Sequence, residues 1–372
     1  MIQNVLIVGG GIGGMTAALS LSRLGVGVTL IDSDPNWRVY GAGISITGMS
    51  LRAFGDLGVL DDIQTRGFVH NGMRPMRFTG ELLGNPMQAP PGSPPIMLGG
   101  GIMRPVLHDI LSTRVREAGI AVRLGVTVEA MAQDQSGVDV TLTDRTMARY
   151  DLVIGADGIY SKMRSMIFPD AAKPQFTDQG CWRIVADRPP EVDRAEIYFG
   201  GPLKLGMSPI SQQQMYVFLL EHVPGNPWFA PETHITHMSA LMAPFGGNVP
   251  AVRAALSAES QIVYRPLEWL LLPDPWYQGR VVLIGDAAHA TTPHMASGAG
   301  LAVEDGLVLA QELARTDDVA LALHNFVARR FDRARLVVET SVRQGEMEIA
   351  RADRAEQTAM LASATKALAE PY

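Results

Sequence analysis

The sequence predicts an α/β fold, α+β overall: a Rossmann-like dinucleotide-binding domain with an inserted, mostly antiparallel sheet domain and a C-terminal helical segment. Three features predict it. A strand, a glycine-rich turn, a helix and a second strand open the chain, period-two segments fill its middle, and helical spacing runs on from Ser297. At roughly 150 residues a domain, the 372 residues are enough for more than one domain.

The first 32 residues predict a βαβ unit. Residues 5–8 are a continuous apolar run, as in a buried parallel strand. Residues 16–24 have helical spacing, Gly25 ends that helix, and residues 26–31 form the next strand. This pattern places a glycine-rich turn between a strand and a helix.

Helices and strands alternate in the next part of the chain. Helices are predicted at residues 48–65 and 104–118, and a meander of strands at residues 122–154, which ends in the apolar strand 152–154. Residues 85–95 are rich in proline, which removes backbone donors and restricts φ. We therefore expect a surface excursion there.

Period-two segments such as 195–199 and 215–220 predict a mostly antiparallel sheet between about residues 175 and 272. Residues 280–284 return to a buried strand, and the rest of the chain is helical. Arginines on these last helices alternate with acidic residues, so we expect them on a solvated face. They are Arg329, Arg330, Arg333, Arg335, Arg343, Arg351 and Arg354.

Composition excludes several classes of protein. The chain has 31 Lys and Arg against 38 Asp and Glu, and a net charge of −7 disfavours nucleic-acid binding, which needs a positive surface. Charged residues such as Arg23 and Asp32 interrupt the apolar stretches before the roughly 18 residues of a membrane span, and the N-terminus lacks the basic start of a cleavable signal. We expect no membrane span and a cytoplasmic protein.

Cysteine and histidine usage gives no sign of a metal. The lone cysteine, Cys181, excludes an intramolecular disulfide and a thiolate cluster and suits a reducing compartment, and we expect it to be a small buried apolar residue. His234 and His237 have i, i+3 spacing, but no third ligand clusters with them. We expect no metal site.

The glycine-rich turn predicts a dinucleotide site. Residues 9–14 (GGGIGG) fit G-x-G-x-x-G between a strand and a helix, where backbone N–H groups can approach a pyrophosphate. Asp32 ends the next strand about 20 residues on, where a carboxylate accepts ribose hydroxyls. An acid at this position favours FAD or NAD over NADP.

Two further motifs indicate a family. Residues 151–158 (DLVIGADG) with Ser161 and Arg164, and residues 285–289 (GDAAH) with Pro293, follow the first motif in order. With Gly41–Ile44 and Arg104 at a helix start, these motifs cover nearly the whole chain. The sequence resembles the para-hydroxybenzoate hydroxylase-like (group A) single-component FAD-dependent aromatic monooxygenases, which include salicylate and 6-hydroxynicotinate hydroxylase-type enzymes.

The resemblance implies a cofactor site. It places Asp32 on the adenosine ribose, Arg104 by the ribityl chain and pyrophosphate, Val128 by the adenine and Asp286 on the ribityl hydroxyls, and it ties Asp157 to both FAD and the nicotinamide nucleotide. The predicted cofactor-binding residues are Gly9, Gly11, Gly13, Gly14, Asp32, Gly43, Ile44, Arg104, Val128, Asp157, Asp286, Pro293, Ala296, Ser297 and Gly298. One departure is that Ala296-Ser297-Gly298 replaces the family's Gly-Gln-Gly turn.

The same resemblance implies the domain boundaries and the reaction. The FAD-binding domain would comprise residues 1–70, 101–172 and 276–315, the substrate domain residues 71–100 and 173–275, and the C-terminal helices residues 316–372. NAD(P)H would reduce the flavin, and a flavin C4a-hydroperoxide would hydroxylate an aromatic or heteroaromatic small molecule. Without a second Rossmann fingerprint, the nicotinamide would bind transiently. The protein would be a monomer or a homodimer.

Other functions stay open from the sequence: a halogenase or reductase of the same fold, or a non-catalytic flavin-binding module. The sequence lacks the Trp-x-Trp-x-Ile-Pro segment that usually marks a flavin halogenase. A colourless protein that takes up no FAD would exclude both enzyme functions.

The inserted sheet and the loop after Pro293 supply the candidate substrate pocket. His294 is the candidate catalytic residue, as a base or an orienting group, with a structural role as the alternative. Arg183 is the charged candidate for an anion anchor, with a surface ion pair as the alternative. The predicted pocket residues are Thr47, Arg183, Met207, Tyr216, Phe218 and His294.

Overall fold

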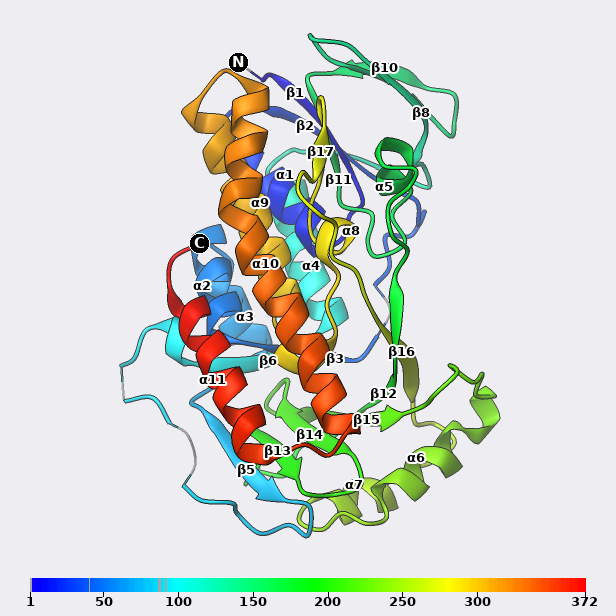
Figure 1. Cartoon of the computed structure of the whole chain (residues 1–372), viewed down its shortest axis with the longest axis vertical. Coiled ribbons are helices and arrows are strands. Elements are labelled where there is room, and N and C mark those ends of the chain that lie inside the picture. Colours follow the sequence, from blue (N-terminus) through cyan, green and yellow to red (C-terminus); the bar gives the residue numbers. More distant parts are fainter. Residues whose placement is uncertain (1, 40, 86–87, 91) are drawn as a thin grey trace.

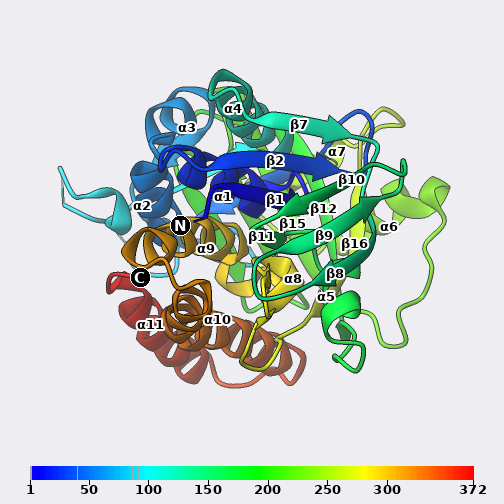
Figure 2. The ribbon, with the colours of Figure 1, turned by 90° about the horizontal axis from the view of Figure 1, so that it is seen from above.

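A parallel sheet forms the centre of the computed structural model, which describes residues 2–39, 41–85, 88–90 and 92–372. Its strand order is β17-β18-β11-β1-β2-β7, and Figure 2 shows β7, β2 and β1 side by side. The strands are β1 (Asn4–Val8), β2 (Gly27–Asp32), β7 (Ala121–Leu124), β11 (Leu152–Gly155), β18 (Val281–Leu283) and the antiparallel edge strand β17 (Tyr277–Gln278). The predicted βαβ start is confirmed.

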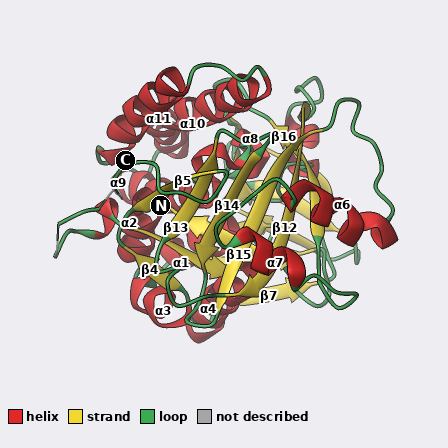
Figure 3. Ribbon diagram, turned by 90° about the horizontal axis from the view of Figure 1, so that it is seen from below, coloured by secondary structure: helices red, strands yellow, loops and turns green. Residues whose placement is uncertain are grey.

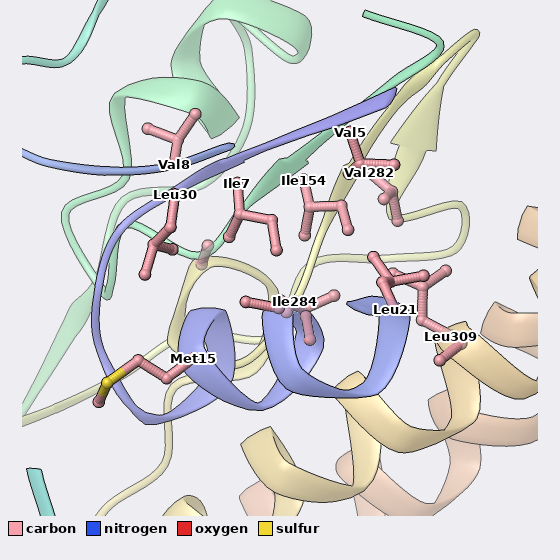
Figure 4. Close-up of a cluster of buried hydrophobic side chains, with 14 of the residues drawn as sticks. Val5, Ile7, Val8, Met15, Leu21, Leu30, Ile154, Val282, Ile284 and Leu309 are labelled. Carbon is pink, nitrogen blue, oxygen red and sulfur yellow. The ribbon is translucent and has the colours of Figure 1, made fainter. Parts of the chain in front are cut away.

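Helix α1 (Ile12–Ser22) connects β1 and β2 and covers one face of this sheet. The side chains of Ile7, Ile154 and Ile284 lie between the sheet and α1 (Figure 4). Every residue of β1 except Asn4 is buried, which explains its continuous apolar run. Burial of this branched apolar surface is the main stabilising contribution to the domain.

The second sheet lies at the other end of the molecule and has the order β16-β12-β15-β14-β13-β5 (Figure 1). Its strands are β5 (Met73–Arg77), β12 (Gln175–Asp187), β13 (Ala195–Phe199), β14 (Lys204–Pro209), β15 (Gln214–His222) and β16 (Val263–Trp269). All neighbours pair antiparallel except β13 and β5. The mostly antiparallel sheet that the sequence predicts is present.

The two faces of this second sheet have different roles. One face packs on α6 (His234–Met242) and α7 (Val249–Ala254), as seen from below in Figure 3, and contributes Trp182 and Met207 to a buried apolar core. Side chains alternate between the faces along each strand, so Arg183 and Tyr216 lie on the opposite face. Met207 is a core residue, and the prediction that it lines the substrate pocket is wrong.

The fold also contains smaller sheets and shorter helices. Three strands form the meander β8 (Val128–Gln133), β9 (Val138–Leu142) and β10 (Met147–Tyr150), and three others form the sheet β3 (Gly43–Ile46), β6 (Gly99–Met103) and β4 (Phe68–His70). The predicted helix 48–65 is two helices, α2 (Gly48–Leu57) and α3 (Leu60–Arg66), because Gly58 ends α2 in the left-handed conformation. Parts of the proline-rich segment 85–95 lie outside the described residues.

Three long helices complete the fold: α9 (Gly298–Arg315), α10 (Val319–Ile349) and α11 (Arg354–Ala369). Helix α10 runs from the parallel sheet to the second sheet (Figure 1). Arg330 on α10 is 0% exposed: its Nε donates to Asp305 Oδ1 at 2.8 Å and its Nη1 to Glu304 Oε2 at 2.7 Å. Arg333 also binds Glu304. The predicted solvated face is therefore wrong for these two arginines.

Two expectations from the sequence concern membrane spans and metal sites. In the part of the chain that the structure describes, no helix combines the length and apolar character needed to cross a membrane. The same residues contain no group of three or more His, Cys, Asp or Glu side chains suited to a metal ion. Cys181 is buried, as predicted.

Candidate active site

The glycine-rich turn leaves the start of α1 open. Gly9 has φ +110°, and a Cβ there would lie 2.3 Å from the carbonyl oxygen of Ala156, so only glycine lets β1 and β11 approach this closely. Gly11 is the N-cap of α1 without a side-chain hydrogen bond, and a Cβ there would contact nothing. The first N–H groups of α1 and its positive end are thus available to a pyrophosphate.

Asp32 ends β2 beside this turn. Its Oδ2 accepts from the N–H of Gly10 at 2.7 Å and its Oδ1 from the N–H of Asp34 at 2.8 Å. Each oxygen keeps a lone pair that can accept a ribose hydroxyl. Trp37, which no sequence pattern indicated, packs against this turn. Its buried ring donates from Nε1 to the carbonyl of Gly10 at 2.9 Å.

The Asp32→Ala variant should weaken binding of a ribose-containing dinucleotide by about 1.5–3 kcal/mol, because it removes a charged hydrogen-bond acceptor. The measurement is the FAD dissociation constant of the apoprotein, by titration of flavin fluorescence. Asp139→Ala, an exposed carboxylate on β9, is the control and should bind FAD like the wild type. An Asp32→Ala protein with wild-type affinity would contradict the assignment.

The second motif, around Asp157, holds the start of helix α5 (Lys162–Ile167). Asp157 accepts from the N–H groups of Lys162 at 2.8 Å and Met163 at 3.0 Å, so its carboxylate caps the helix. Arg164 donates to the carbonyl of Ala287 at 3.0 Å, which joins this motif to the third one. The geometry gives both side chains a positioning role, and direct contact of Asp157 with the cofactor stays a prediction.

The third motif places Asp286 at the start of α8 (Asp286–His289). Asp305 Oδ2 holds this turn, because it accepts from the N–H of Gly285 at 2.8 Å and pairs with His289 Nε2 at 2.6 Å. The Asp286 side chain is exposed, yet desolvation raises the pKa of its carboxyl group, partly offset by His289 and Arg104. The carboxyl group is thus accessible to solvent, although protein surrounds much of it.

Arg104 lies within electrostatic range of Asp286. It begins α4 (Arg104–Glu117) and is exposed, and burial lowers its pKa, as does the nearby positive charge of Arg183. Asp286 acts in the opposite direction on the same guanidinium. Two cations and one carboxylate from three separate parts of the sequence are therefore within electrostatic range of each other.

The second sheet contributes Arg183 and Tyr216 to this site. Arg183 Nε donates to the Tyr216 hydroxyl at 3.0 Å. Burial raises the pKa of Tyr216 to about 12, and the charge of Arg183 offsets this only in part, so the phenol stays protonated near neutral pH. Gly43 packs directly on this tyrosine, since a Cβ there would lie 2.6 Å from Tyr216 Cβ. The Phe218 ring is 5.6 Å from the Tyr216 ring.

Two other predicted residues have structural partners. Thr47 caps α2, where its Oγ1 accepts from the N–H of Ser50 at 3.4 Å. The Val128 side chain is buried in the main core. Their predicted contacts with substrate and adenine stay predictions.

The loop before α9 lies between the third motif and the C-terminal helices. Pro293 is exposed and Ala296 adopts a left-handed conformation with φ +50°. Ser297 donates its hydroxyl to the carbonyl of Met295 at 2.8 Å and does not cap α9. The positive end of α9 is therefore free of a side-chain cap and can stabilise a negative charge.

His294 points away from any open space. Its side chain is 0% exposed, its Nδ1 lies 2.9 Å from Thr292 Oγ1, and its Nε2 lies 3.5 Å from Glu348 Oε2 on α10. This burial favours the structural alternative for His294, and a direct catalytic role stays a prediction. Sequence reasoning also missed its partner Glu348, which lies far along the chain on another helix.

Comparison with known proteins agrees with this geometry. The FAD binding domain family matches residues 3–341. The chain is 32% identical over 359 residues to the aurachin C monooxygenase/isomerase of Stigmatella aurantiaca, covering 92% of this chain and 89% of that protein. It is 32% identical over 320 residues to the 2-heptyl-3-hydroxy-4(1H)-quinolone synthase of Pseudomonas aeruginosa, covering 83% and 80%.

A solved structure shares the fold. Klebsiella pneumoniae HpxO complexed with FAD and uric acid superposes with a TM-score of 0.83 at 24% identity, covering 99% of this chain and 93% of that chain. Together with the open start of α1, Asp32 and the enclosed Asp286, these matches identify FAD as the cofactor. The chain belongs to the FAD-binding domain family of FAD-dependent monooxygenases.

Proposed function

We propose that this enzyme uses NAD(P)H and O2 to hydroxylate an aromatic or heteroaromatic ring that carries a negative charge. The observation that carries the proposal is the hydrogen-bonded pair of Arg183 and Tyr216, which lies within electrostatic range of Arg104, itself near Asp286. A quinolone and uric acid, the compounds named for two relatives, are heteroaromatic. Both support a flat ring as the substrate.

The described residues fit FAD along its length. The uncapped start of α1 suits the pyrophosphate, Asp32 the adenosine ribose, and Asp286 and Arg104 the ribityl side. Bound FAD, reduced by NAD(P)H, supplies the chemistry that activates O2 and delivers an oxygen atom to the ring.

The protein's own residues bind and orient the substrate. The Arg183 guanidinium uses Nε on Tyr216 and keeps its other N–H groups for a carboxylate or phenolate. The Tyr216 hydroxyl, an acceptor for Arg183, still has its proton to donate to the same anion. The free N–H groups at the start of α9 can stabilise negative charge that develops beside them.

The proposal also covers the cellular compartment, the oligomeric state and the domain boundaries. We place the enzyme in the cytoplasm as a monomer or homodimer, with the domain boundaries predicted from the sequence. The single buried cysteine supports a reducing compartment.

Pairs of ring compounds test the substrate class. FAD-loaded enzyme is mixed with NADH or NADPH and with aromatic acids or their methyl esters, and NAD(P)H oxidation is recorded. We expect acids and phenols to accelerate oxidation and the matched esters without a phenol to have little effect. Equal stimulation by acid and ester across a broad panel would contradict an anionic substrate.

A further inference from the structure

Glu348, near the end of α10, joins three parts of the fold. Its Oε1 accepts from Lys204 Nζ at 2.8 Å, on strand β14 of the second sheet, and from Gln344 Nε2 at 2.8 Å. Its Oε2 lies 3.5 Å from His294 Nε2, in the loop before α9, and neither atom has a hydrogen-bond partner among the described residues. The same Gln344 amide donates to Gln357 of α11 at 2.7 Å.

The packing around His294 leaves it little freedom. The imidazole lies against Gly345, where a Cβ would be 3.1 Å from its Cε1. On its other side, Nδ1 lies 2.9 Å from the hydroxyl of buried Thr292. His294 therefore connects residues 292–294 of the loop to α10, and Glu348 connects α10 to the second sheet.

The charges of this cluster define the tautomer of His294. Burial lowers the pKa of His294, so the ring is neutral, whereas Lys204 and His294 together hold the pKa of Glu348 well below its usual range against the effect of burial. An ionised carboxylate only accepts hydrogen bonds. A proton on Nε2 would face this carboxylate, so we expect that tautomer, with Nδ1 as the acceptor for the Thr292 hydroxyl.

We infer that Glu348 is a positioning residue for hydroxylation: through His294 it holds the loop 291–298, and through Lys204 it holds that loop in register with the second sheet. Because the loop carries Pro293 and the start of α9 on one side and the sheet carries Arg183 on the other, Glu348 sets the relative position of cofactor and substrate. This inference rests on the proposed function, which assigns the loop to the flavin and Arg183 to the substrate. Helix α10, which spans both parts (Figure 1), is the rigid support.

The Glu348→Gln variant tests the inference with little change in shape. The carbonyl of the introduced amide takes over the hydrogen bonds from Lys204 and Gln344, so the NH2 group of that amide faces His294 Nε2. We expect the proton of His294 to move to Nδ1, which 15N NMR of labelled histidine reads directly, without any substrate. Glu346→Gln, an exposed position on the same helix, is the matched control and should leave the His294 signals unchanged.

The second measurement is coupling, which is the amount of hydroxylated product formed per NAD(P)H oxidised. A misaligned substrate delays oxygen transfer more than flavin reduction, so we expect Glu348→Gln to lower product formed per NAD(P)H by at least about threefold while the rate of NAD(P)H oxidation changes less. The lost oxidation equivalents should appear as hydrogen peroxide. Glu346→Gln should couple like the wild type.

The Lys204→Met variant gives an independent test, in which we expect a change in the pKa of His294. In the described structure, the charged groups that face His294 are Glu348 and Lys204. Without Lys204, the charge of Glu348 acts on His294 alone, so the pKa of His294 should rise by about one unit or more. NMR titration measures this shift even if Glu348→Gln fails to fold.

These outcomes separate the inference from the proposed function. Wild-type protein that binds no FAD would overturn the proposed function. If the wild type binds FAD and hydroxylates a ring, then unchanged His294 signals in Glu348→Gln and Lys204→Met, or wild-type coupling in Glu348→Gln, would overturn the role of Glu348.

Discussion

Arg330→Met is expected to lower the free energy of unfolding by about 3–5 kcal/mol, because it leaves buried carboxylates without their counter-charge. Glu304 and Asp305 are both fully buried, and Arg330 binds them at 2.7 and 2.8 Å. Arg333 still pairs with Glu304, so Asp305 bears most of the loss. Urea unfolding of the apoprotein measures the change.

The same variant should also weaken FAD binding, since Asp305 holds the turn before Asp286 through Gly285 and His289. The control is Arg335→Met on the same helix. Arg335 is 49% exposed and pairs with Asp332 at i, i+3, so its loss should change stability by less than about 1 kcal/mol. Equal unfolding midpoints for the two variants would show that the buried cluster does not stabilise the fold.

Arg183→Met is expected to lower kcat/KM for an anionic substrate by about 30- to 150-fold, the loss of a charged hydrogen bond worth about 2–3 kcal/mol. FAD content should stay normal, because Arg183 lies on the second sheet and none of the predicted FAD-binding residues belongs to that sheet. The measurement is substrate-stimulated NAD(P)H oxidation across substrate concentrations. For a neutral ring analogue that the enzyme hydroxylates, Arg183→Met should lower kcat/KM much less.

Arg253→Met provides the control for Arg183. Arg253 is an exposed cation on α7, which packs on the opposite face of the second sheet. Its variant should have wild-type kinetics. Unchanged kinetics in Arg183→Met as well would remove Arg183 from the substrate site.

Local patterns explain what the sequence could predict. The turn at residues 9–14 and the strand end at Asp32 lie within one βαβ unit, so spacing along the chain reports their spatial relation. Asp286 follows a buried strand directly and is likewise found by position. Alternation along strands also predicts which residues share a face, but not which face meets the cofactor. Met207 was misplaced for that reason.

Contacts between distant helices explain what the sequence could not predict. Arg330 meets Asp305, 25 residues away, only because α9 and α10 pack side by side, and a charge run on a helix is ordinarily solvated. His294 turns toward Glu348 for the same reason. Neither partner lies within a window in which periodicity or a motif could reveal it.

Incorporation of oxygen from 18O2 tests directly whether this enzyme is a monooxygenase that hydroxylates a ring. FAD-loaded enzyme, NAD(P)H and the aromatic acid that best stimulates oxidation are incubated under 18O2, and the product is analysed by mass spectrometry. We expect one 18O atom in each product molecule and no product when FAD or NAD(P)H is omitted. Product without the label, or oxidation of NAD(P)H that no aromatic compound stimulates, would contradict this function.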